Sequence, residues 1–174
     1  MTLKTKIAVV DNHHLVRHAV TKYLNETDRF TVSFECSNGL ELIKELRSIN
    51  TQALPKIVLT DLNMEGMDGL ETTRWLKKNF PDIKVLMLTM RSDDPTIIRL
   101  IRAGISGYLI KNIDGAELYD ALVTVDEGGK YFKTLDASMI FRAAEKDPAE
   151  ETWDSLSDKE RQFVRLCADR KSVV

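Results

Sequence analysis

The chain has 174 residues, of which 43% are hydrophobic and 30% are charged, and its formal net charge at pH 7 is −2. This composition is that of a soluble folded protein, and the near-neutral charge gives no sign of a nucleic-acid or membrane-surface partner. No apolar run is long enough to cross a membrane and the N-terminus lacks the apolar region of a signal peptide, so we expect a cytoplasmic protein with no membrane contact.

Short apolar runs alternate with amphipathic stretches along the first 127 residues. The runs have strand length, and the stretches place apolar residues at helical spacing. Five strand-then-helix units in this order predict an α/β fold, in which helices cover both faces of a doubly wound five-stranded parallel sheet. The expected strands are 6–10, 30–36, 56–60, 84–88 and 108–110, and the helices that follow them are 15–24, 40–46, 70–79, 96–103 and 114–127.

The pattern changes after Gly128-Gly129. A short helix is expected at 138–144, and a last helix at 158–169, where Ser157 and Glu160 form a capping-box pattern. An acidic stretch containing proline separates the two helices and predicts an exposed linker. The chain is therefore expected to comprise a first domain over residues 1–127, a linker with a short helix over 128–153, and a partial all-α segment over 154–174.

Polar residues follow four of the five expected strands, at the point where each strand ends. They are Asp11 and Asn12, then Asp61, Thr89 and Lys111. In a doubly wound sheet ligands bind at the carboxyl ends of the strands, so these side chains are expected to converge. Clustered carboxylates repel one another and favour a hard divalent cation such as Mg²⁺. Asp61 can then act as a nucleophile that accepts a phosphoryl group, with Thr89 and Lys111 binding the phosphoryl oxygens.

The segments around these residues resemble the receiver domain of two-component response regulators over about residues 4–127. Each segment is unspecific alone, but their order and spacing together are specific to the family. The resemblance implies a flavodoxin-like receiver fold, a phosphoacceptor at Asp61, and a sensor histidine kinase as the phosphoryl donor. The matching segments are Val10-Asp11-Asn12-His13, residues 59–69 (LTDLNMEGMDG), Leu88-Thr89 and residues 107–111 (GYLIK).

The resemblance also implies the metal ligands and the switch residues. It assigns Mg²⁺ to Asp11, Asn12, Asp61 and the backbone carbonyl of Asn63. It places Tyr108 at the switch aromatic, whose ring is expected to turn from exposed to buried when Thr89 moves toward the phosphoryl group. Such a local charge event would bias a two-state element of the domain. His13 and His14 are interpreted as ordinary residues at the start of the first helix.

A second resemblance covers residues 156–166 (LSDKERQFVRL), which are similar to the opening of a LuxR-type helix-turn-helix domain. It implies a homodimer on activation and transcriptional control through DNA. The chain stops at Val174, before a recognition helix could form, and residues 145–174 carry more acidic than basic side chains. DNA binding is therefore expected only through a complete output domain.

One departure from the receiver pattern supports an alternative. Receivers usually carry a second acid at the position of Asn12, and two unit charges 4 Å apart interact by about 4 kcal/mol at an effective dielectric near 20. We therefore expect weak Mg²⁺ binding and a more stable metal-free site. The alternative is a pseudo-receiver, an interaction module that works without phosphorylation. A haloacid dehalogenase-like phosphatase would need an acid where Asn63 stands, so we expect a signalling protein rather than an enzyme.

Overall fold

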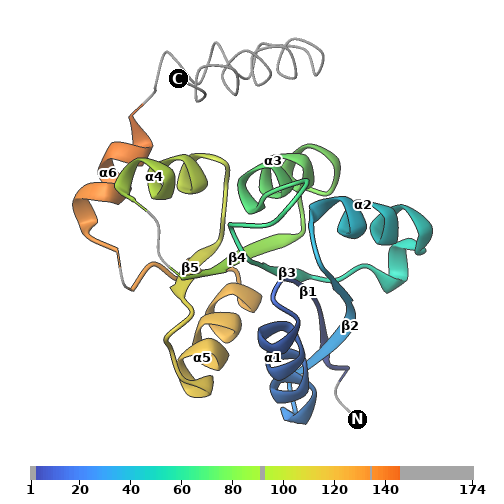
Figure 1. Ribbon diagram of the computed structural model, residues 1–174. Coiled ribbons are helices and arrows are strands. Elements are labelled where there is room, and N and C mark those ends of the chain that lie inside the picture. Colours follow the sequence, from blue (N-terminus) through green and yellow to red (C-terminus); the bar gives the residue numbers. More distant parts are fainter. Residues whose placement is uncertain (1–2, 91–92, 134, 146–174) are drawn as a thin grey trace.

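The computed structural model describes residues 3–90, 93–133 and 135–145, along which strands and helices alternate (Figure 1). The expected helix at 158–169, and with it the predicted DNA-binding segment 154–174, lies outside the described residues. None of the described helices has the length and apolar character needed to cross a membrane. The elements are β1 (Thr5–Val10), α1 (His14–Glu26), β2 (Phe30–Cys36), α2 (Gly39–Ser48), the 3-10 helix η1 (Thr51–Ala53), β3 (Ile57–Thr60), α3 (Gly69–Asn79), β4 (Lys84–Thr89), α4 (Asp94–Arg102), β5 (Gly107–Ile110), α5 (Gly115–Asp126) and α6 (Ala137–Ala144).

The five strands form one sheet in the order β2-β1-β3-β4-β5, and every neighbouring pair is parallel. After β1 the chain forms β2 at one edge of the sheet, and it then crosses to the other side of β1 to add β3, β4 and β5 in turn. The predicted α/β class and doubly wound five-stranded sheet are therefore confirmed. The strand order reverses between β1 and β3, which is the place where folds of this kind bind their ligands.

Apolar side chains cover both faces of the sheet, as parallel strands require. Alternate residues of β1 point to opposite faces, so that Ile7 and Val9 join one core while Ala8 and Val10 join the other. Figure 1 shows α1 and α5 on the first face, and α2, α3 and α4 on the second. Packing on both sides fixes the strands relative to one another, and it therefore also fixes the side chains that follow their carboxyl ends.

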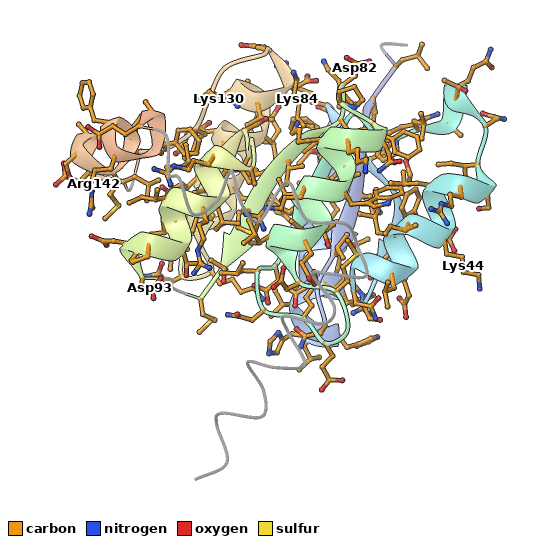
Figure 2. The ribbon with its side chains drawn as sticks, turned by 90° about the horizontal axis from the view of Figure 1, so that it is seen from above. Lys44, Asp82, Lys84, Asp93, Lys130 and Arg142 are labelled. Atoms are coloured by element: carbon orange, nitrogen blue, oxygen red, sulfur yellow. The ribbon has the colours of Figure 1, made fainter. Side chains whose placement is uncertain are left out.

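Helix α4 begins at Asp94, two residues before its expected start. The side chain of Asp93, which Figure 2 shows at this end of the helix, accepts a hydrogen bond from the backbone N–H of Thr96 at 2.9 Å. Pro95 lies in the first turn, where its missing N–H leaves no bond unmade. The aspartate cap and the proline together set the start of this helix.

The expected short helix is present as α6, and it lies beside α4 (Figures 1 and 2). Arg102, the last residue of α4, donates hydrogen bonds to the backbone carbonyls of Arg142 at 3.0 Å and Glu145 at 2.6 Å. The guanidinium of Arg142 in turn pairs with the carboxylate of Asp94 at 3.2 Å. A groove of about 350 Å³ between the two helices is lined partly by Ile98. These contacts join both ends of α4 to the last turn of α6.

Candidate functional site

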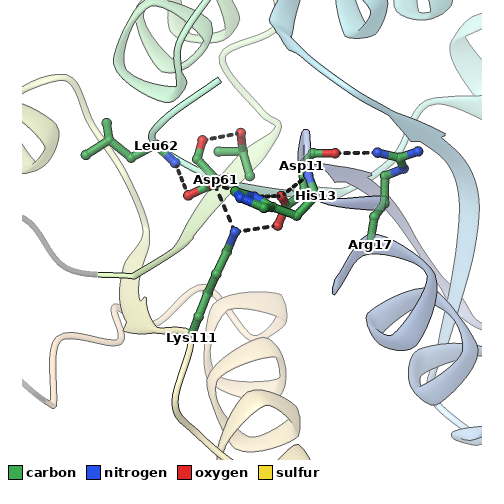
Figure 3. A network of polar contacts seen from close by, with 7 residues as sticks. Asp11, His13, Arg17, Asp61, Leu62 and Lys111 are labelled. Atoms are coloured by element: carbon green, nitrogen blue, oxygen red, sulfur yellow. Dashed lines mark hydrogen bonds and ion pairs between the residues drawn. The ribbon is translucent and has the colours of Figure 1, made fainter. Parts of the chain in front are cut away.

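Asp61 directly follows β3 and is 3% exposed. Its backbone N–H donates to the carbonyl of Val10 at 2.8 Å, which ties the end of β3 to the end of β1. One carboxylate oxygen accepts the backbone N–H of Leu62 at 2.7 Å, and the other accepts the ammonium of Lys111 at 2.8 Å (Figure 3). Because both oxygens have a donor, the orientation of this carboxylate is fixed.

Lys111 bridges the two buried acids of the site. Its Nζ atom lies 2.7 Å from Asp11 Oδ2 and 2.8 Å from Asp61 Oδ2, and its side chain is 5% exposed (Figure 3). Its backbone N–H donates to the carbonyl of Thr89, so β4 and β5 are also joined at this rim. One ammonium between two carboxylates leaves the cluster with one unit of negative charge, which favours a further cation.

The loop after β1 brings a histidine into the same cluster. The Oδ1 atom of Asp11 accepts the backbone N–H of His13 at 2.8 Å and lies 3.1 Å from the Nδ1 atom of that residue. The same Nδ1 atom is 3.8 Å from Asp61 Oδ2. Arg17, from the first turns of α1, donates to the backbone carbonyl of Asp11 and pairs with Glu35 at 3.3 Å. The guanidinium therefore supports the loop from its other side.

Thr89 ends β4, the strand between those that precede Asp61 and Lys111. The residue is fully buried, and its hydroxyl has no hydrogen-bond partner within the described part of the chain. A buried hydroxyl without a partner destabilises a fold by about 1–3 kcal/mol, and such groups are found where a ligand supplies the missing bond. Its place at the rim fits a polar ligand that binds between the strand ends.

Two predicted metal residues are less buried than Asp11 and Asp61. The side chains of Asn12 and Asn63 are exposed, in the loops after β1 and β3. The second of these loops is held close to the sheet because the backbone N–H of Gly69 donates to the carbonyl of Leu62 at 2.8 Å. A Cβ atom at Gly69 would lie 2.3 Å from the carbonyl oxygen of Asp61, so only glycine permits this approach.

Tyr108 is 1% exposed and belongs to the core that also contains Met87, Ile97 and Leu100. Its ring is therefore already buried, whereas the resemblance to receiver domains predicts that burial only after Thr89 has moved. The two residues of α4 in this core connect the ring to the helix that contacts α6. Strand β4 lies between β3, which precedes Asp61, and β5, which contains Tyr108.

The donor set fits a divalent cation. Asp11, His13 and Asp61 each offer one atom, and these three atoms lie within 4.8 Å of one another. Carboxylate oxygens are the ligands that Mg²⁺ prefers, and the uncompensated negative charge of the cluster would attract it. Asp11, Asp61 and Lys111 lie together, as their positions after strand ends predict, and His13 lies at the start of α1, as expected, with its ring beside Asp11. The spacing Asp-X-His was the available signal, because an aspartate often accepts the N–H two residues later.

Comparison with known proteins identifies relatives along almost the whole chain. Residues 7–123 match the family described as the response regulator receiver domain. The chain is 34% identical to the response regulator GacA of Pseudomonas syringae pv. syringae (strain B728a) over 169 residues, which cover 97% of this chain and 77% of GacA. It is 32% identical to the response regulator protein VraR of Staphylococcus aureus over 163 residues, 94% of this chain and 75% of VraR.

Solved structures share the fold. A LuxR-family two-component response regulator from Aurantimonas sp. SI85-9A1 superposes with a TM-score of 0.68 at 26% identity, covering 82% of this chain and 96% of that one. The isolated receiver domain of RcsB from Salmonella enterica serovar Typhimurium, solved with the phosphomimetic BeF₃⁻, superposes with a TM-score of 0.67 at 23% identity, covering 82% of this chain and 100% of that one. The second similarity establishes the fold alone.

Proposed function

The chain belongs to the response regulator receiver family, and on this basis we propose that phosphorylation of Asp61 by a sensor histidine kinase switches a DNA-binding output. The observation that carries this proposal is the ammonium of Lys111, held between the buried carboxylates of Asp11 and Asp61. A cation placed beside an oriented aspartate can stabilise the negative charge of a phosphoryl group without any movement of the backbone.

The proposed transfer needs no general base, because Asp61 attacks as a carboxylate. One of its oxygens forms a bond to phosphorus while the bond between phosphorus and the donor histidine nitrogen breaks. The electron pair of that bond stays with the imidazole of the kinase. The N–H of Leu62 and the ammonium of Lys111 hold the carboxylate in one orientation beforehand, which lowers the entropic cost of the encounter.

Two side chains are proposed to bind the transferred group. Lys111 shares its ammonium between the carboxylates and can share it with a phosphoryl oxygen. The buried hydroxyl of Thr89, which has no partner within the described residues, donates to another oxygen. Because Thr89 ends the strand beside Tyr108, a change at the hydroxyl alters the packing of the ring, and through it the position of α4.

The metal ion has its own place in the proposal. Asp11 and Asp61 would hold Mg²⁺, with the side-chain oxygen of Asn12 and the backbone carbonyl of Asn63 as further ligands. When bound, the ion neutralises charge on the phosphoryl oxygens. Asn12 contributes no charge, so the expectation of weak Mg²⁺ binding stands as part of the proposal.

The output is proposed from the relatives. GacA and VraR are response regulators, and a structural relative at 26% identity belongs to the LuxR family. We extend DNA binding through a complete output domain, homodimerisation on activation and a cytoplasmic location to this chain. The pseudo-receiver is not favoured, because a module that needs no phosphoryl group has no use for the buried pairing of Asp61 with Lys111. Nor does it need a buried Thr89 hydroxyl that finds no partner among the described residues.

The decisive experiment is phosphorylation by a small donor. The chain is incubated with acetyl phosphate over a Mg²⁺ titration, and the phosphorylated fraction is measured by intact mass spectrometry. We expect one metal-dependent phosphoryl group, lost in Asp61→Asn and retained in the matched control Asp136→Asn, which removes an exposed carboxylate that caps α6. A chain that stays unmodified, or an Asp61→Asn variant modified as well as its parent, would contradict the proposal. Many substrate turnovers per chain would instead indicate an enzyme.

A further inference from the structure

The three histidines of the chain all lie at the start of α1, but only one faces the acids. His13 directs Nδ1 toward Asp11 Oδ1 at 3.1 Å and Asp61 Oδ2 at 3.8 Å, as Figure 3 shows. The rings of His14 and His18 stack on each other along the exposed side of the helix, with centroids 6.2 Å apart. His13 therefore has surroundings that differ from those of its two neighbours.

The spacing of the donor atoms suits one shared ion. Neighbouring ligands of an octahedral ion with bonds of about 2.1 Å are about 3 Å apart, and opposite ligands are about 4.2 Å apart. The separation of 3.1 Å between His13 Nδ1 and Asp11 Oδ1 matches neighbouring ligands. The separation of 3.8 Å from Nδ1 to Asp61 Oδ2 lies between the two values. The imidazole thus stands where a ligand of an ion bound to Asp11 would stand.

The backbone keeps the imidazole at this place. The N–H of His13 donates to the same Asp11 oxygen that its ring approaches, which fixes the loop relative to the carboxylate. That oxygen has a lone pair left for a metal, because a carboxylate oxygen can accept two bonds. The other oxygen of Asp11 pairs with Lys111. The oxygen facing His13 and the ring nitrogen therefore both remain available to an ion.

We propose that His13 is a ligand of the divalent cation bound by Asp11 and Asp61, and that it shifts the preference of this site from Mg²⁺ toward first-row transition ions, for which Mn²⁺ serves as the probe. Mg²⁺ binds oxygen donors, whereas first-row transition ions accept an imidazole nitrogen more readily, with Mn²⁺ the weakest binder of that series. Asn12 strengthens the shift, because a neutral amide replaces one of the anionic oxygens on which Mg²⁺ depends. This inference rests on the proposed function, which places the cation at the two acids.

Pulsed electron paramagnetic resonance of bound Mn²⁺ tests the proposal, because an imidazole ligand adds a ¹⁴N modulation to the echo. The full chain is prepared without a histidine tag, and its folding is checked by circular dichroism. We expect the modulation in the parent chain and in His14→Ala, which disrupts the exposed histidine pair, and we expect it to vanish in His13→Ala. Mn²⁺ affinity should fall at least about tenfold in His13→Ala, since even outer contacts of a metal site affect affinity by that factor. Mg²⁺ affinity, measured by competition, should change by less than about threefold.

Two results would overturn the proposal. A chain that binds Mn²⁺ without nitrogen modulation has an all-oxygen site, and a modulation that persists in His13→Ala comes from another group. In both cases metal-dependent phosphorylation of Asp61 would remain intact, so the proposed function would survive. A parent chain that binds neither ion and takes up no phosphoryl group would remove both proposals.

Discussion

Replacement of Lys111 by methionine removes the ammonium that lies between Asp11 and Asp61 while keeping a side chain of similar length. At separations of 2.7 and 2.8 Å, each of the two ion pairs is worth about 6 kcal/mol at an effective dielectric near 20. Desolvation of three buried charges offsets most of this attraction, and removal of one partner from a buried pair typically costs about 3–5 kcal/mol. We therefore expect Lys111→Met to lower the free energy of unfolding by about 3–5 kcal/mol, from a total of about 5–15 kcal/mol for such a domain.

A divalent cation should recover part of this loss. In Lys111→Met the two carboxylates have no competing ammonium, so the variant should bind Mg²⁺ or Mn²⁺ more tightly than its parent. An ion at one hundred times its dissociation constant adds about 2.7 kcal/mol to the stability of the folded state. Urea unfolding followed by circular dichroism, with and without the ion, measures both effects.

The matched control is Lys44→Met, which removes an exposed ammonium on α2, seen at the right edge of Figure 2. Substitution of such a surface charge changes stability by about 0.5 kcal/mol or less. If Lys111→Met were as stable as this control in metal-free buffer, the ammonium between Asp11 and Asp61 would not stabilise the fold. If the cation stabilised both variants to the same extent, the ammonium would not compete with the cation for the two carboxylates.

Three further predictions concern the loop after β1, the linker helix and the far end of the sheet. Asn12→Asp should tighten Mg²⁺ binding, by about tenfold at most because the position is exposed and screened, and unchanged affinity in calorimetry would contradict this. Arg102→Ala should free α6 from α4, because it removes the guanidinium that binds the backbone carbonyls of Arg142 and Glu145 at the end of α6. Limited proteolysis should then cut within α6 faster while the core of the domain stays protected. Burial alone raises the pKa of Asp126, but hydrogen bonds from Lys56 and Arg29 outweigh it and hold that pKa below its usual value. A carboxyl whose pKa is lowered on folding stabilises the folded state above a pH of about 4, and this stabilisation is lost as the pH falls through the folded-state pKa. Asp126→Asn should therefore be less stable than the parent at pH 7. Its free energy of unfolding should also fall less steeply as the pH is lowered.

The sheet was predictable because its strands are buried on both faces. Such strands are continuous apolar runs, which the sequence displays plainly, and the alternation with helices permits few arrangements. The start of α4 was less predictable, since Asp93 and Asp94 are chemically alike and only the bond to Thr96 identifies the cap. The contact of α6 with α4 was not predictable, because Arg102 reaches a segment 40 residues later in the chain.

Some residues of the site could likewise be placed from the sequence, and others could not. Asp11, Asp61 and Lys111 were expected to meet because each follows a strand, and the positions of strand ends depend only on topology. The place of His13 depends on the loop conformation and on the turn of one ring. The Asp-X-His spacing indicates the backbone bond to Asp11 but not the direction of the ring. The burial of Tyr108, and the lack of a partner for the Thr89 hydroxyl in the part of the chain that the structure describes, likewise depend on packing details that arise only in the folded chain.

The charges of the cluster give Asn12 a second consequence under the proposed function. Two carboxylates and one ammonium leave one negative charge, which repels an incoming phosphoryl group, whereas a bound divalent cation reverses the sign to one positive charge. With aspartate at position 12 the same loaded site would be neutral. The neutral amide therefore weakens capture of the cation but strengthens the attraction of the loaded site for an anionic donor. Phosphorylation by acetyl phosphate should then be faster in Asn12→Asp at limiting cation and slower at saturating cation, so that the two rate curves cross. Curves that keep the same order at every cation concentration would show that charge at this position acts on only one of the two steps.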